Sequence, residues 1–174
     1  MLLLNLNEIR TPHERFEQVY QPDALAGDRE TFSVAAPVSL AFDIYKDKDQ
    51  FRVVGGVQTA LKLLCGRCLK PFTWPLGATF DLRYQPHAHN TGEGEREVEE
   101  GDLSTAFYEN DAIDLGGLMR EQLYLSLPMK PLCREDCRGL CPQCGTDWNM
   151  GKCDCRPEWV DPRFAALKAL KKES

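Results

Sequence analysis

The 174-residue sequence lacks any apolar run long enough to cross a membrane as a helix. The opening Met1-Leu2-Leu3-Leu4-Asn5-Leu6 is too short for the apolar core of a secretory signal, and no positive residue precedes it. Hydrophobic residues make up 43% of the chain and charged residues 28%, a balance typical of globular proteins that need no lipid. We therefore expect a cytoplasmic protein without a membrane partner, whose thiols stay reduced.

A surplus of positive charge is also absent. The net charge is −6: residues 1–129 hold 12 Lys and Arg against 20 Asp and Glu, and residues 130–174 hold 9 against 7. Most nucleic-acid-binding proteins carry a strongly basic face, because neutralising phosphates supplies much of their affinity. Any contact of this chain with RNA is therefore expected to be local, or to be made through protein partners.

Catalytic signatures are missing as well. The chain has no glycine-rich phosphate loop, no serine nucleophile motif and no histidine base in a recognisable context. Its three histidines, His13, His87 and His89, all lie outside the cysteine segments, and His87-x-His89 is more simply explained as a solvated pair. The six acids between Glu93 and Asp102 have almost no apolar neighbours, which is typical of a solvated tract. We predict that the protein is not an enzyme and has no small-molecule substrate.

Cysteine, in contrast, is abundant and clustered. Six cysteines fall within 23 residues and a further CxxC lies far upstream; the eight are Cys65, Cys68, Cys133, Cys137, Cys141, Cys144, Cys153 and Cys155. Thiolates spaced one to three residues apart can converge on one ion, and tetrahedral zinc is the usual reason for such pairs. We predict two structural zinc ions, with all eight cysteines as metal ligands.

The pairing of these ligands is open at this point. Cys141-Pro-Gln-Cys144-Gly145 has the form of a zinc knuckle, whose glycine leaves room for the tight turn around the metal. Cys153 and Cys155 could complete that site. The second site would then consist of Cys65, Cys68, Cys133 and Cys137. This is one of several possible partitions, because a sequence sets the inventory of ligands and not their connectivity.

Alternating hydrophobicity predicts three successive strands, at 38–45, 51–65 and 72–84. Short connections between them favour an antiparallel meander, with Cys65-Gly-Arg-Cys68 at the tip of the hairpin formed by the second and third strands. Gly55-Gly56 interrupts the second strand and suggests a bulge or bend. A redox CxxC needs a thiolate of lowered pKa at a helix N-terminus, so this position disfavours redox catalysis.

The rest of the chain completes an α+β fold. Residues 85–111 hold eight acids against one arginine and are expected to form an acidic loop. Apolar residues at helical spacing predict a helix over 114–127, capped by Asp114, stopped by Pro128 and packed on the sheet. A short basic helix is predicted for 164–172. We accordingly divide the chain into a β-rich α+β body, residues 1–128, and a cysteine-rich zinc segment with the terminal basic helix, residues 129–174.

Several of these motifs occur together in one known family. The run from Leu125 to Gly145, the Cys65-Gly-Arg-Cys68-Leu69 turn, the helix start at Ala112-Ile-Asp-Leu115 and the Asp161-Pro-Arg-Phe-Ala-Ala-Leu167 tail resemble the YceD family of bacterial and plastid proteins. The similarity covers most of the chain from about residue 38 onward and keeps the motifs in family order.

The resemblance implies a non-enzymatic role in accumulation of the large-subunit ribosomal RNA, since family members are associated with that process. Their genes commonly neighbour one for a large-subunit ribosomal protein, so the implied partner is a ribosomal protein or large-subunit ribosomal RNA, contacted directly or within an assembly complex. Family members also tolerate loss of many of these cysteines, which implies that the metal stabilises and does not catalyse. The alternative is a CxxC-based thiol oxidoreductase or redox-regulated chaperone.

Overall fold

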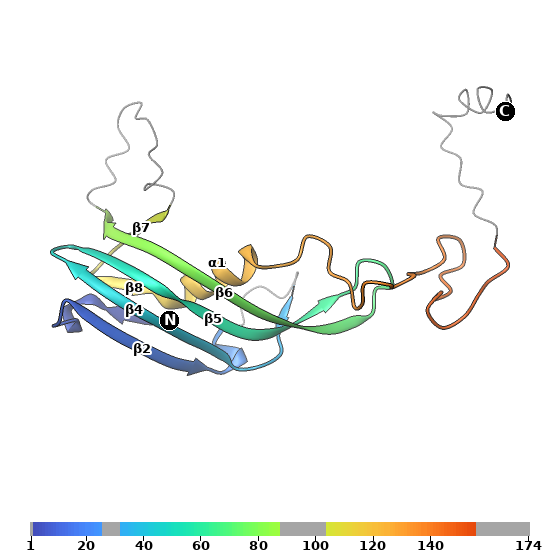
Figure 1. Cartoon of the computed structure of the whole chain (residues 1–174), viewed down its shortest axis with the longest axis horizontal. Helices are drawn as coiled ribbons and strands as arrows, with labels where there is room; N and C mark the ends of the chain where they lie inside the picture. The colour runs from blue at the N-terminus through green and yellow to red at the C-terminus, as the bar shows by residue number, and fades with distance from the viewer. Residues whose placement is uncertain (1, 26–31, 88–103, 156–174) are drawn as a thin grey trace, which may run out of the picture.

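The fold is built on one large mixed β-sheet, described by a computed structural model for residues 2–25, 32–87 and 104–155 (Figure 1). Five strands lie in the order β2 (His13–Tyr20), β4 (Val38–Asp47), β5 (Gln50–Leu64), β6 (Pro71–Pro86) and β7 (Thr105–Tyr108), while β3 (Ser33–Val34) pairs separately with β5. A smaller sheet joins β1 (Leu3–Asn5) to β8 (Ala112–Asp114). Two short 3-10 helices, η1 (Leu6–Glu8) and η2 (Pro22–Leu25), flank β2.

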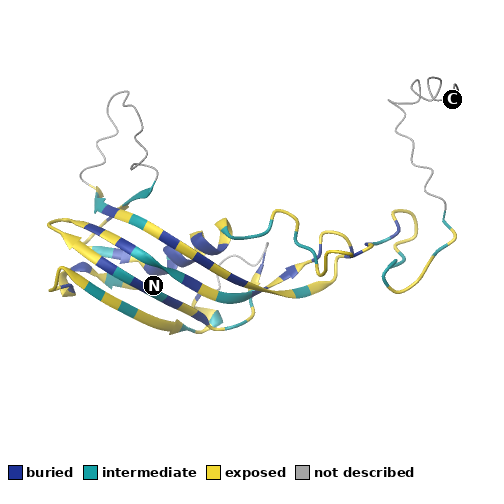
Figure 2. Ribbon diagram, viewed as in Figure 1, coloured by how far each residue is buried: buried dark blue, intermediate teal, exposed yellow. Residues whose placement is uncertain are grey.

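The predicted meander is confirmed as β4, β5 and β6. All three strands are antiparallel, with Ile44 opposite Val53 and Val53 opposite Leu82. Burial alternates along each strand, as Figure 2 shows, because successive side chains point to opposite faces. The inward side chains form the main core; they include Val38, Leu40, Ile44, Val53, Val57, Leu61, Leu76 and Phe80.

The glycine pair in β5 does not form a bulge. Gly55 faces Phe42 and Gly56 faces Ala41 in continuous register, with no inserted residue. A Cβ at Gly55 would lie 2.2 Å from the carbonyl oxygen of Ala41. Glycine is therefore required at position 55 because the backbone of β4 approaches closely. Besides a bulge, such a close approach is a common reason for glycine inside a strand.

The single helix of the described residues, α1 (Leu115–Leu125), begins where the sequence predicted. The Asp114 side chain accepts a hydrogen bond from the backbone N–H of Gly117 at 3.0 Å, which satisfies one of the free donors of the first turn. The helix ends two residues before the predicted Leu127, with Ser126 as its C-cap. Its buried side chains lie against β1, β5 and β6 and include Leu118, Met119 and Leu123. It is not long and apolar enough to cross a membrane, and no other α-helix occurs in the described part of the chain.

The prediction of an irregular acidic loop over 85–111 is wrong at both ends. β6 continues to Pro86, and β7 pairs with it in parallel, with Arg83 opposite Thr105. The parallel pair makes the sheet mixed, where the sequence predicted a purely antiparallel one. The acidic tract itself and His89 lie outside the described residues, as does the predicted basic helix at 164–172. The division at residue 128 stays a prediction.

Candidate metal centres

The eight thiols gather into two groups of four. In each group the sulfur atoms all lie within 4.8 Å of one another. The first quartet is Cys65, Cys68, Cys133 and Cys137; the second quartet is Cys141, Cys144, Cys153 and Cys155. Among the pairings that the sequence left open, the structure thus brings together the one that joins the hairpin CxxC to the start of the cysteine-rich segment.

The first quartet begins at the turn between β5 and β6, where Cys65 and Cys68 are both buried. The turn is closed by backbone hydrogen bonds from Cys65 to the carbonyl of Lys70 at 3.0 Å and from Leu69 to that of Cys65 at 2.9 Å. The backbone N–H of Arg67 also points at the Cys65 sulfur, 3.5 Å away. The long hairpin therefore presents two sulfurs and backbone donors at its tip, the local structure of a zinc knuckle.

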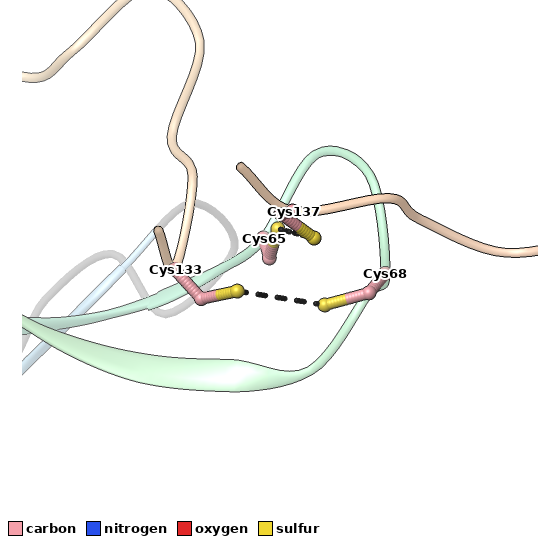
Figure 3. A group of neighbouring side chains, drawn as sticks. All are labelled: Cys65, Cys68, Cys133 and Cys137. Carbon is pink, nitrogen blue, oxygen red and sulfur yellow. Dashed lines mark hydrogen bonds between the residues drawn. The ribbon is translucent and has the colours of Figure 1, made fainter. Parts of the chain in front are cut away.

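Cys133 and Cys137 arrive on the segment that follows α1. Sulfur–sulfur distances of 3.8 Å join Cys65 to Cys137 and Cys68 to Cys133 (Figure 3). Four sulfurs about 2.3 Å from a tetrahedral ion stand about 3.8 Å apart, whereas a disulfide needs about 2.05 Å. The spacing matches a metal site and excludes disulfide bonds between these pairs.

Hydrogen bonds outside the sulfurs hold the two halves of the first quartet together. Gly66 donates its N–H to the carbonyl of Pro131 at 2.7 Å. The guanidinium of Arg67 donates to the carbonyl oxygens of Glu135 at 3.2 Å and Cys137 at 2.7 Å. Arg67 therefore positions the loop that carries two of the ligands, a role its sequence neighbourhood did not reveal.

The second quartet lies in a segment with no regular strand or helix. Cys141 and Cys144 form a second knuckle, in which Gly145 at φ +73° donates to the carbonyl of Cys141 at 2.9 Å. The Cys144 sulfur lies 3.1 Å from the hydroxyl of Thr146. Cys144 is exposed and Cys153 and Cys155 are only half-buried, so little apolar packing supports this site.

The thiols of each quartet have opposed proton affinities. Burial alone would raise the pKa of Cys65, but backbone N–H groups of Cys68, Cys133 and Arg67 outweigh it and lower this pKa to about 6. Burial and the neighbouring thiols raise the pKa of Cys133 to about 12. A thiolate at Cys65 therefore favours the protonated form of Cys133.

The second quartet repeats this division. Hydrogen bonds from the hydroxyl and backbone of Thr146 lower the pKa of Cys144 to about 6, while the hydrogen bond to Cys144 raises that of Cys155 to about 12. Four thiolates this close would need a cation between them, and a soft divalent ion such as Zn²⁺ would supply the missing charge.

The two histidines within the described residues, His13 and His87, take no part in either group. His13 Nε2 lies 2.8 Å from a carboxylate oxygen of Asp43, and His87 Nε2 lies 3.8 Å from one of Glu109, both at the sheet. Each candidate site therefore consists of four cysteines. A tetrahedral site with four protein ligands leaves no position for a water molecule, so the arrangement is typical of structural zinc.

Comparison with known proteins places the chain in a family. Residues 53–171, which include all eight cysteines, match the family model described as "Large ribosomal RNA subunit accumulation protein YceD". The chain belongs to the YceD family. The expectation drawn from the sequence motifs is thereby confirmed.

Individual relatives of the chain come from plants and bacteria. The chain is 25% identical over 167 residues to "Large ribosomal RNA subunit accumulation protein YCED homolog 1, chloroplastic" of Arabidopsis thaliana, covering 84% of the chain and 52% of that protein. It is 29% identical over 161 residues to an uncharacterized protein of Mycobacterium tuberculosis, covering 91% and 75%. It is 35% identical over 78 residues to YlbN of Bacillus subtilis, covering 44% of each. The chain thus spans about half the length of the Arabidopsis relative. No solved structure matches it.

Proposed function

We propose that this protein is a non-enzymatic zinc-binding factor that supports accumulation of large-subunit ribosomal RNA, or assembly of the large ribosomal subunit. The observation that carries the proposal is the YceD family match, whose described function is large ribosomal RNA subunit accumulation. The two quartets supply the physical role of the protein in that process: metal-clamped turns that present a fixed surface to a partner.

The ligand geometry favours a structural metal over a catalytic one. Catalytic zinc normally keeps an open position and recruits histidine or a carboxylate. Here each group offers four sulfurs and, within residues 2–25, 32–87 and 104–155, no other ligand. The redox alternative is disfavoured because Cys65 and Cys68 occupy a turn between two strands, and because their sulfurs converge with two further thiols at 3.8 Å.

The proposed partner is a ribosomal protein or large-subunit ribosomal RNA, contacted directly or within an assembly complex, in the cytoplasm. For an RNA contact, Arg138, Trp148 and Lys152 line one cavity beside the second quartet. Cations next to an aromatic ring are the usual means of holding phosphates and stacking bases of single strands. Arg134, a third cation nearby in the sequence, instead donates to the Asn149 side chain at 2.7 Å, so part of its role is structural.

Depletion of the protein in its own host tests this function. We expect large-subunit ribosomal RNA to fall relative to small-subunit ribosomal RNA, and expression of the wild-type chain to restore the ratio. A Cys68→Ser, Cys144→Ser double variant, produced at matched abundance, should restore it less well. An unchanged ratio after depletion would sink the proposal. Full rescue by the double variant would separate the ribosomal role from metal binding.

A thiol titration of the metal-loaded protein addresses the redox alternative. Structural sites shield their thiolates, whereas a redox pair reacts quickly. We therefore expect slow modification of all eight cysteines until a chelator removes the metal. Rapid reaction of two thiols in the loaded protein would favour the oxidoreductase.

A further inference from the structure

Three consecutive residues of the second quartet's loop contact both quartets. Asp147, Trp148 and Asn149 lie between Cys144 and Cys153, and backbone pairing ties them back to the first quartet: Leu140 donates to the carbonyl of Arg67 at 3.2 Å, and Trp148 donates to that of Gly139 at 3.0 Å. These two bonds connect the hairpin tip to the second knuckle through the backbone alone.

The Asn149 side chain contacts the first quartet, although the residue lies in the loop of the second quartet. Its amide nitrogen lies 3.5 Å from the Cys137 sulfur and donates to it. Its carbonyl oxygen accepts from the backbone N–H of Arg138 at 2.8 Å and from the guanidinium of Arg134 at 2.7 Å. Asn149 thus holds both ends of the loop around Cys137 and directs one donor at a ligand sulfur.

The side chains that precede Asn149 complete the connection. Trp148 Nε1 donates to the Cys153 sulfur at 3.3 Å, within the second quartet. Asp147 accepts from the amide of Asn149 at 2.6 Å through one oxygen, and its other oxygen lies 2.7 Å from Nζ of Lys70, at the end of the first hairpin turn. Neighbouring residues therefore donate to sulfurs of different sites.

We propose that Asn149 is a positioning residue shared by the two metal sites, and that through it filling either site strengthens metal binding at the other. The inference rests on the proposed zinc sites. Order in the Cys144–Cys153 loop aims the Asn149 donor at Cys137, and a fixed Cys133–Cys137 loop in turn orders Asp147–Asn149. Binding of the first metal orders residues that the second site also needs in order. The second metal then binds with a smaller loss of conformational entropy, which is positive coupling between the sites.

The two sites differ in what holds them before metal binds. The first has two ligands on a rigid hairpin, buried with Phe72 and Leu132 in a small apolar cluster. The second has all its ligands in an irregular segment. We therefore infer that the first site fills first, and that the second depends on it for part of its affinity.

A cycle of zinc competition titrations on the full chain tests the coupling. In Cys144→Ser only the first site keeps its four cysteines, and in Cys68→Ser only the second site does. If the sites are coupled, the product of the two association constants of the wild type exceeds the product of the two single-site constants. We expect an excess of about tenfold, since removal of a partner around the ligands typically lowers metal affinity 10- to 100-fold. In an Asn149→Ala background this excess should vanish.

Three further variants make the result specific. Asn149→Asp keeps the acceptor for Arg138 but removes the donor to Cys137, so it should weaken the first site as Asn149→Ala does. Trp148→Phe removes only the donor to Cys153 and should weaken the second site about tenfold in the Cys68→Ser protein. Asn7→Ala changes an exposed asparagine on η1 and should preserve the excess.

The outcomes separate this inference from the function on which it rests. Wild-type protein that binds no zinc would overturn the zinc sites and the coupling together. Two ions bound without any excess in the wild type, or an excess that persists in Asn149→Ala, would overturn the coupling and leave the zinc sites intact. Amide exchange over β4–β6 should be unchanged in every variant and shows that the sheet remains folded.

Discussion

Nζ of Lys70 lies 2.7 Å from Oδ2 of Asp147, so an ion pair joins the hairpin turn of the first quartet to the loop of the second. Lys70 and the amide donors of Asn149 lower the pKa of Asp147 to about 2. The contribution of this carboxylate to stability is therefore complete above its ordinary pKa of 3.8 and is lost as pH falls towards 2. Thiolates would take up protons and release zinc well above that range, so we expect metal loss, and not protonation of Asp147, to disrupt this junction first as pH falls.

Purified protein should contain two zinc ions per chain. The expectation rests on two quartets whose sulfur spacing fits a tetrahedral ion. Elemental mass spectrometry gives the stoichiometry, and X-ray absorption at the zinc edge should show sulfur ligands at about 2.3 Å. Metal-free protein with a complete structure would contradict the zinc assignment. A single bound ion would contradict only the two-site version.

Cys144→Ser should unfold the second knuckle and leave the sheet intact. The main core is formed by the sheet and α1, while the segment around the second quartet has little apolar packing of its own. Structural zinc contributes about 10 to 16 kcal/mol in small peptides, more than this segment can recover from packing. Hydrogen exchange should therefore rise most in residues 141–155 and stay unchanged in the sheet. An equal rise across Val57–Tyr84 would show that metal and sheet form one cooperative unit.

The sequence predicts best where one physical signal dominates. Leu76, Ala78 and Phe80 are buried and alternate with exposed residues along β6, so the strand and its buried face follow from the sequence. In β2 the inward positions include Phe16 and Gln18, and Val19 points outward with 65% of its surface exposed. An edge strand with polar residues on both faces has no such period, so β2 escaped prediction. β7 escaped because four residues pair in parallel with a distant strand, a tertiary effect.

The clustering of the candidate ligands was likewise easier to predict than the contacts that support them. Close spacing of cysteines predicts that they are metal ligands, and all eight cysteines fall in the two quartets. Arg67 and Asn149 act through a guanidinium and an amide that reach across 68 and 12 residues, to Glu135 and Cys137. Such contacts leave no periodic pattern in the sequence, so they emerge only when the chain is folded.

Gly139→Ala should destabilise the junction between the two quartets. Gly139 has φ +78°, and a Cβ there would lie 2.9 Å from the carbonyl oxygen of Arg67. The left-handed conformation alone costs a non-glycine residue about 1 to 2 kcal/mol, and displacement of the Arg67 backbone adds to it. Denaturant unfolding of the zinc-loaded segment, followed by Trp148 fluorescence, measures the decrease in stability.

Two other glycines serve as controls for that substitution. Gly145 has φ +73° with no atom within 4 Å of a built Cβ, so Gly145→Ala should show the conformational cost alone. Gly151 also has open space and no positive φ, so Gly151→Ala should be close to neutral. Equal decreases in stability for Gly139→Ala and Gly145→Ala would mean that the close approach to Arg67 does not matter.

Tyr84→Phe should remove an alkaline loss of stability in the sheet. Burial on the inner face of β6 raises the pKa of Tyr84 to about 12, with Glu121 and Asp114 adding to the effect. Between pH 10 and 12 the unfolded chain releases this proton and the folded chain retains it, so stability falls as pH rises. The full decrease is about 2 to 3 kcal/mol.

Urea unfolding at pH 9 and at pH 11.5 measures the effect of Tyr84. The stability difference between these two pH values should be smaller in Tyr84→Phe than in the wild type. Tyr45→Phe, which changes a tyrosine with 45% of its surface exposed, should retain the wild-type difference. Identical alkaline decreases in all three proteins would exclude Tyr84 as their source.

Charge-changing variants should distinguish a protein partner from an RNA partner. Each Zn²⁺ held by four thiolates leaves two negative charges uncompensated, so metal loading offsets the small positive balance of residues 130–174. We therefore expect the main contact to be a basic ribosomal protein facing the acidic residues, and neutralising Glu93, Glu95, Glu97, Glu99 and Glu100 should weaken it, chiefly by slowing association. Reversing Arg138 and Lys152 to Glu should leave that complex unchanged.

Direct RNA binding predicts the opposite pattern, in which the reversal lowers the salt slope by roughly 0.7 for each phosphate that the protein no longer neutralises. Tight, salt-sensitive binding of the isolated protein to ribosomal RNA, insensitive to the Glu changes, would establish the RNA route in place of the protein route.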